Sequence, residues 1–242
     1  MKLIAPVNVD TITLQAPAKL NLTLDVLGRR MDGYHEMDML MVGISLYDTI
    51  QLTPSPDIQV QYIGSPPPEG DTVQLAIQAY IAQAEGRLGA KIQVDKRIPS
   101  EAGLGGGSAD AAATLLGLHQ AYQALSAADL HKAAKSVGAD VPFCMYSLPG
   151  RVQGIGDRII PIPMPAQPLW FLVVKPEGGM HTREIFESLT QPMLHPDTDA
   201  AQAALEKGDI AALGKLLKNG MQPAASARMP EIAVLCGQLM KL

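Results

Sequence analysis

The spacing of hydrophobic and polar residues predicts strands and helices mixed along the whole chain. Residues 18–26 alternate strictly, which is typical of a strand that presents Leu20, Leu22, Leu24 and Val26 on one face and Lys19, Asn21, Thr23 and Asp25 on the other. The pattern predicts further strands at residues 48–53, 58–63, 91–96, 151–156, 158–162 and 169–174. Helical spacing predicts helices at residues 73–84, 108–123, 126–138, 198–207 and 209–218, and a last helix that opens at Pro230. Gly138 is expected to end its helix as a left-handed cap, and Pro142 to hold Val141 in an extended conformation.

Residues 99–113 join a glycine-rich loop to one of these helices. They read PSEAGLGGGSADAAA, so a loop almost without side chains leads directly into an alanine-rich segment. Unpaired N–H groups and the positive end of the helix dipole favour an anion there. A Walker loop needs a lysine after the glycines, and this sequence has none there, so that motif is excluded. A dinucleotide-binding loop needs Gly or Ala at the position of Ser108, so that motif is a weak match. A phosphate-binding loop is the functional interpretation, and a glycine turn capped by Ser108 is the alternative.

Composition narrows the class of protein. The 242 residues are 47% hydrophobic and 18% charged, which suits one large domain or two modest ones. A formal charge of −5 opposes general binding to nucleic acid, and no apolar run approaches membrane-spanning length. Two cysteines without paired spacing, Cys144 and Cys236, suggest a reducing compartment. We therefore expect a cytoplasmic protein with no nucleic-acid or membrane partner, and the oligomeric state is left open.

Three segments resemble the GHMP small-molecule kinases: PAKLNL with DGYH at residues 17–22 and 32–35, GLGGGSADAA at 103–112, and GADVPF at 138–143. The resemblance implies an α+β fold of two lobes. Residues 1–148 would form a nucleotide-binding lobe like domain 2 of ribosomal protein S5, and residues 149–242 a ferredoxin-like lobe. Family members commonly carry a third glycine-rich motif that this sequence does not contain, so the second lobe is expected to be incomplete and the activity of this short form is left open.

The DGYH segment resembles one branch of the family. Its members use ATP, with Mg²⁺, to phosphorylate the 2-hydroxyl of a cytidyl diphosphate derivative of methylerythritol, in the non-mevalonate route to isoprenoids. Two alternatives stay open at this point. One is another GHMP kinase, of the mevalonate or homoserine type, and the other is a non-catalytic binding protein of this fold.

The resemblance also implies roles for individual residues. Asp140 would accept the proton of the substrate hydroxyl, and Lys19 would stabilise the developing charge. The ATP phosphates would be held by the loop, at Pro99, Gly103, Leu104, Gly105, Gly106, Gly107, Ser108 and Ala109. Ser108 would cap the following helix or hold Mg²⁺. Lys96 would flank the nucleotide, or would be one of an exposed basic pair with Arg97.

Substrate recognition is expected elsewhere in the chain. By resemblance, the cytidyl substrate would contact Asn21, Tyr34, His35, Thr182 and Phe186, and its cytosine would lie near Tyr34, His35 and Phe186. Thr182 as a helix N-cap and Phe186 as a core residue are equally compatible with the sequence. The family usually has an asparagine that helps to hold adenine at the start of the helix that follows residue 71. This chain reads Asp71-Thr72-Val73 there.

Overall fold

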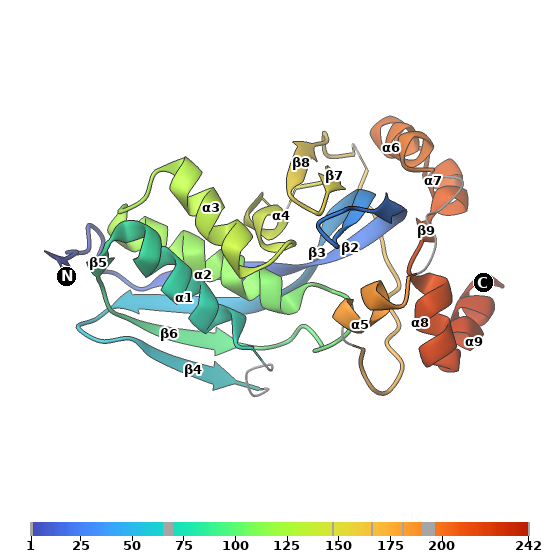
Figure 1. Ribbon diagram of the computed structural model, residues 1–242. Coiled ribbons are helices and arrows are strands. Elements are labelled where there is room, and N and C mark those ends of the chain that lie inside the picture. Colours follow the sequence, from blue (N-terminus) through green and yellow to red (C-terminus); the bar gives the residue numbers. More distant parts are fainter. Residues whose placement is uncertain are drawn as a thin grey trace. The chain divides into compact units, whose positions relative to one another are not determined.

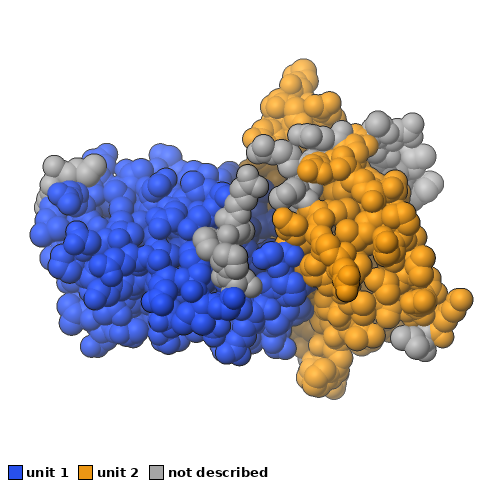
Figure 2. Space-filling view, turned by 90° about the horizontal axis from the view of Figure 1, so that it is seen from below, with its two compact units in different colours: residues 1–19, 43–100, 104–147 blue, residues 20–42, 101–103, 148–242 orange. Residues whose placement is uncertain are grey.

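Two compact units make up the protein, and Figure 2 colours them separately. The computed structural model describes residues 2–64, 70–146, 148–165, 167–180, 182–189 and 197–241. Unit 1 contains residues 1–19, 43–100 and 104–147, and unit 2 contains residues 20–42, 101–103 and 148–242. Two long strands, β2 (Ile12–Arg29) and β3 (His35–Pro54), therefore belong partly to each unit. The assignment of residues 1–148 and 149–242 to two domains stays a prediction.

Unit 1 is a sheet covered on one face by helices (Figure 1). The second half of β3 pairs antiparallel with β6 (Ala90–Asp95), and β6 pairs parallel with β4 (Gln59–Ile63). The helix α1 (Thr72–Ala84) connects β4 to β6, because parallel neighbours need a crossover. It packs against α2 (Gly106–Tyr122) and α3 (Ala127–Val137), and α4 (Val141–Tyr146) packs against α2. Two short strands, β1 (Lys2–Leu3) and β5 (Gly86–Arg87), pair separately.

Packing in the core of unit 1 sets the distance between α2 and the sheet. Ile50 and Leu52 of β3 are fully buried, as is Leu115 of α2. A Cβ on Gly117 would lie 3.1 Å from Leu14 Cδ1 and 3.3 Å from Leu52 Cδ1, so a larger residue would require these leucine side chains to shift by a few tenths of an ångström. The N-terminus of α2, where the glycine loop ends, is thereby held against a rigid layer.

Unit 2 is built on the other parts of β2 and β3. The first half of β3 pairs antiparallel with β7 (Gly150–Gly154), β7 pairs with β8 (Arg158–Pro161), and β9 (Lys218–Asn219) pairs parallel with β2. The helix α6 (Thr198–Lys207) packs on α7 (Ile210–Leu216), and α8 (Gln222–Arg228) packs on α9 (Pro230–Leu239). The short helix α5 (Thr182–Glu187) completes this unit.

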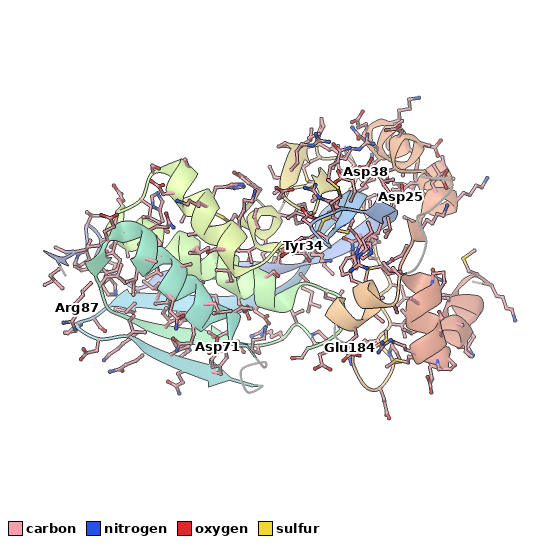
Figure 3. The ribbon with its side chains drawn as sticks, viewed as in Figure 1. Asp25, Tyr34, Asp38, Asp71, Arg87 and Glu184 are labelled. Carbon is pink, nitrogen blue, oxygen red and sulfur yellow. The ribbon has the colours of Figure 1, made fainter. Side chains whose placement is uncertain are left out.

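The polar face of β2 is buried as well as the apolar face. Thr23 and Asp25 are fully buried, and the Thr198 hydroxyl donates a 2.8 Å hydrogen bond to Asp25 Oδ2 at the start of α6. Asp38, labelled with Asp25 in Figure 3, accepts two hydrogen bonds from the Arg151 guanidinium at 2.8 and 2.5 Å. The strand predicted at 18–26 is confirmed, but burial does not alternate along it, because distant segments supply partners that cover the polar face.

Three local predictions are wrong. Residues 169–174 form no strand, and Trp170 in that run is 93% exposed. Gly138 has an extended backbone, with φ −178°, where a left-handed cap was expected. Pro142 was expected to hold Val141 extended, but both lie in the first turn of α4, where a missing N–H costs no hydrogen bond. The proline-rich segment at 65–68 and His181 lie outside the described residues.

Candidate active site

The glycine loop runs from β6 to α2 and leaves the start of that helix open. The helix begins at Gly106, and its N-cap is Gly105, whose φ of +70° is a left-handed conformation that favours glycine. No side chain caps this end. Ser108 was expected to be the cap, but it lies inside the first turn of the helix. Among the described residues, the first backbone N–H groups of this 17-residue helix therefore have no side-chain cap, which suits an anion.

Each of the three consecutive glycines lies against a different neighbour. A Cβ on Gly105 would lie 2.9 Å from Lys19 Cγ. A Cβ on Gly106 would lie 3.0 Å from Ile98 Cγ2, and one on Gly107 would lie 3.2 Å from Thr72 Oγ1. The Thr72 hydroxyl also donates a 2.8 Å hydrogen bond to the Gly107 carbonyl. The loop is thus fixed by packing on its inner side, so its glycines serve the protein's own close contacts.

The structure brings Lys19 and Asp140 together beside this loop. Lys19 Nζ lies 3.4 Å from Asp140 Oδ2, and the backbone N–H of Lys19 donates to the Leu104 carbonyl at 2.9 Å. The lysine side chain is 8% exposed, and the carboxylate, which directly precedes α4, is 34% exposed. A nearly buried ammonium beside a partly open carboxylate can orient that carboxylate and stabilise negative charge on a bound molecule. The roles of both residues stay predictions.

Lys96 lies in a buried cluster of charges. Its Nζ lies 2.5 Å from Asp48 Oδ2 and 2.6 Å from Asp110 Oδ2. Burial raises the pKa of Asp110 to about 7; Lys96 opposes this rise and Asp48 adds to it. Burial lowers the pKa of Lys96, but Asp110 and Asp48 outweigh it and leave that pKa above its ordinary value. The side chain is 4% exposed, which excludes the alternative of an exposed basic pair with Arg97.

The predicted substrate residues lie on unit 2. The rings of His35 and Phe186 stack, with centroids 5.6 Å apart and an angle of 24° between their planes. Tyr34, labelled in Figure 3, is 60% exposed, and its backbone N–H donates to Asp32 Oδ1 in the turn before it. Stacked and exposed rings of this kind suit a planar base. Phe186 is half-buried.

For the other predicted site residues, the structure gives position and burial but no contact that indicates a role. Asn21 lies half-buried on β2. Thr182 begins α5, but its side chain lies outside the described residues. Pro99 and Gly103 are exposed in the loop, whereas Leu104 and Ala109 are buried. The exposed positions of the loop therefore lie in its first half, whereas residues 105–108 are half-buried.

Several residues near the loop were missed by the sequence prediction. Asp71 caps α1 by accepting hydrogen bonds from the N–H groups of Val73 and Gln74, and also from the Tyr62 hydroxyl. Burial and this carboxylate raise the pKa of Tyr62. Asp48 and Asp110 were also missed. The available signal was a lone acidic residue inside an apolar run, in LYDTI and in SADAAA.

The residues present fit a nucleotide phosphate and a metal ion that arrives with it. Among the described residues there is no cluster of three or more His, Cys, Asp or Glu side chains that could hold a metal alone. Ser108, half-buried in the first turn of α2, offers a hydroxyl oxygen of the kind that Mg²⁺ accepts beside phosphate oxygens. Cys144 is buried, and burial raises the pKa of its thiol to about 12, which disfavours the reactive thiolate.

Comparisons with known proteins agree with this geometry. Residues 71–147 match the GHMP kinases N terminal domain. A 4-diphosphocytidyl-2-C-methyl-D-erythritol kinase of Symbiobacterium thermophilum is 43% identical over 231 residues, which cover 92% of this chain and 81% of that protein. The protein of that name from Carboxydothermus hydrogenoformans is 40% identical over 233 residues, with 94% and 81% covered.

Solved structures give the same result. A crystal structure of 4-(cytidine 5′-diphospho)-2C-methyl-D-erythritol kinase has a TM-score of 0.71 at 29% identity and covers 95% of this chain and 83% of its own. A homoserine kinase from Cytophaga hutchinsonii has a TM-score of 0.63 at 19% identity, with 93% and 76% covered, which shows a shared fold alone. Within the described parts of the chain, every helix is too short or too polar to cross a bilayer.

Proposed function

The chain belongs to the 4-diphosphocytidyl-2-C-methyl-D-erythritol kinase family of the GHMP kinases, and from this membership we propose that it phosphorylates the 2-hydroxyl of 4-diphosphocytidyl-2-C-methyl-D-erythritol with ATP. The observation that carries the proposal is the 3.4 Å pair of Lys19 and Asp140 beside an uncapped helix N-terminus. A proton acceptor, a cation and a phosphate-binding end of a helix are what phosphoryl transfer to an alcohol requires.

The reaction divides among these residues. The backbone N–H groups from Gly105 to Ser108 hold phosphate oxygens and align the γ-phosphorus with the acceptor hydroxyl. Asp140 takes the hydroxyl proton as the oxygen forms its bond to phosphorus and the bond to the β-phosphate oxygen breaks, releasing ADP. Lys19 stabilises the negative charge and keeps Asp140 oriented. Bound Mg²⁺, with Ser108 as a protein ligand, would neutralise phosphate charge.

Recognition of the cytidyl group falls to the aromatic residues of unit 2. His35 and Phe186 already lie ring to ring, and Tyr34 is exposed at the adjoining turn. We propose that these rings stack on cytosine, which would separate this substrate from mevalonate or homoserine. A cytoplasmic location is also proposed, and the free thiols of Cys144 and Cys236 support it.

Coupled measurement of ADP release tests the proposal. The purified chain is incubated with ATP and Mg²⁺ and, in separate reactions, the cytidyl substrate, mevalonate or homoserine. Release with the cytidyl substrate alone is expected. Release with mevalonate or homoserine alone would assign another GHMP kinase activity, and nucleotide binding without ADP release from any of the three would indicate a non-catalytic protein.

A further inference from the structure

A buried ion cluster joins the two ends of the glycine loop. It consists of Asp48 on β3, Lys96 directly after β6, and Asp110 in the second turn of α2, with side chains 0%, 4% and 2% exposed. The Lys96 ammonium contacts both carboxylates, at 2.5 and 2.6 Å. The cluster therefore ties the strand before the loop to the helix after it.

Asp48 also fixes the first residues of the loop. Its second oxygen, Oδ1, accepts hydrogen bonds from the backbone N–H groups of Arg97 and Ile98 at 2.5 and 2.8 Å. Ile98 in turn lies against Gly106, where a Cβ would be 3.0 Å from Ile98 Cγ2. A shift of the Asp48 carboxylate would thus be transmitted through Ile98 to the first residue of α2.

Lys96 faces the loop from its inner side. A Cβ on Gly106 would lie 3.5 Å from Lys96 Nζ, so the ammonium sits directly behind that backbone. Two carboxylates share this single ammonium, and the cluster has no excess positive charge to offer a phosphate. Asp110 Oδ1 is buried without a hydrogen-bond partner among the described residues. An arrangement this costly in desolvation is poor evidence for stability but is suited to fixing one conformation.

We propose that Asp48, Lys96 and Asp110 are positioning residues that hold the glycine loop in the shape that receives the nucleotide phosphates. The proposal rests on the proposed function, because it assigns the cluster to the same phosphate site. Lys96 acts through the backbone of Gly106 and does not contact the nucleotide. This differs from the expectation, based on family resemblance, that Lys96 flanks the nucleotide.

The variant Asp110→Asn distinguishes a positioning role of Lys96 from direct contact of Lys96 with the nucleotide. It keeps the shape of the side chain and removes one of the two carboxylates that contact the Lys96 ammonium. Amide hydrogen exchange of residues 104–108 is measured without ligand, and the affinity for Mg²⁺-ADP is measured by calorimetry. Positioning predicts that the loop amides exchange faster and that ADP binds about 10-fold more weakly, since small displacements of binding groups have effects on the order of 10- to 100-fold. The KM for the cytidyl substrate should not change.

The neighbouring exposed ion pair supplies the control. Arg97 Nη2 lies 3.1 Å from Asp95 Oδ2, and the arginine side chain is 68% exposed. Arg97→Met should leave loop exchange and ADP affinity within about twofold of the parent chain, because exposed pairs contribute little. Asp48→Asn retains an oxygen for the two backbone N–H groups and repeats the measurement if Asp110→Asn does not fold.

The two interpretations of Lys96 predict opposite results. If Lys96 contacts the nucleotide, releasing it from one carboxylate should leave ADP affinity unchanged or increase it. Unchanged or tighter binding of ADP, or loop amides that exchange as in the parent chain, would overturn the positioning role. The exchange measurement needs no turnover, so it decides this proposal even where ADP release with the cytidyl substrate fails to appear.

Discussion

Replacing Asp140 by asparagine separates its chemical role from its structural one. Asparagine preserves the shape of the side chain but cannot accept a proton at neutral pH. A general base contributes on the order of 10²–10⁴-fold to the rate, which corresponds to about 3–5 kcal/mol of barrier. We therefore expect kcat to fall by that factor, with the KM for ATP changed little, because the role proposed for Asp140 is at the acceptor hydroxyl and not at the ATP phosphates.

The structural cost of the same change is smaller. At 3.4 Å the attraction between Lys19 Nζ and Asp140 Oδ2 amounts to about 5 kcal/mol at an effective dielectric constant of about 20. The carboxylate is 34% exposed, and solvent screening of a partly exposed pair reduces this to about 1 kcal/mol of stability. Asp140→Asn should consequently raise the activation free energy by several times more than it lowers the free energy of unfolding.

Initial rates of ADP release and urea unfolding curves measure the two effects. Asp95→Asn is the matched control, because its carboxylate is 32% exposed and is also paired with a cation, at 3.1 Å. It should keep a kcat close to that of the parent chain. Near-normal kcat in Asp140→Asn, with unfolding unchanged, would refute the assignment of Asp140 as the base.

Three further predictions concern Asp110, Gly105 and Phe186. Asp110 has a pKa of about 7 in the folded protein, against an ordinary value of 3.8. Between these two pH values the folded state binds more protons than the unfolded state. The free energy of unfolding should therefore fall by up to about 4 kcal/mol as the pH rises from about 4 to about 7. Denaturation at about pH 5 and about pH 8 should show a smaller fall in Asp110→Asn. Gly105→Ala places a Cβ 2.9 Å from Lys19 Cγ at a φ of +70°, so kcat and melting temperature should both drop, with about 1–2 kcal/mol from the backbone alone; an unchanged kcat would argue against this contact. Phe186→Ala should raise the KM for the cytidyl substrate about 10-fold while the KM for ATP stays constant, and equal changes in both would contradict a role in base recognition.

The sequence predicted the glycine loop and its helix because both depend on neighbouring residues. A run of glycines before alanines specifies its conformation locally, and the observed helix begins within two residues of the expected position. The α+β fold of the GHMP kinases is confirmed by the structure and its likeness to a solved relative. The predicted helix boundaries at Gly138 and Pro142 were wrong, because helix ends depend on the conformation of single capping residues.

Long-range contacts were beyond what residue patterns alone could predict. No spacing relates Lys19 to Asp140, and only family resemblance suggested that they meet. The cluster of Lys96 was missed because an acidic residue in a strand or an alanine-rich helix ordinarily indicates exposure, whereas Asp48 and Asp110 are buried against one ammonium. The apolar run at 169–174 has strand propensity, but propensity decides little without a pairing partner.

The most direct test of the account is the mass of the cytidyl substrate after incubation with ATP, Mg²⁺ and the chain, measured in parallel with Asp140→Asn. The account predicts a gain of one phosphoryl group with the parent chain and a strongly reduced gain with the variant. A cytidyl substrate whose mass is unchanged, while ATP is still bound, would contradict the assignment of this chain as a phosphotransferase for that substrate.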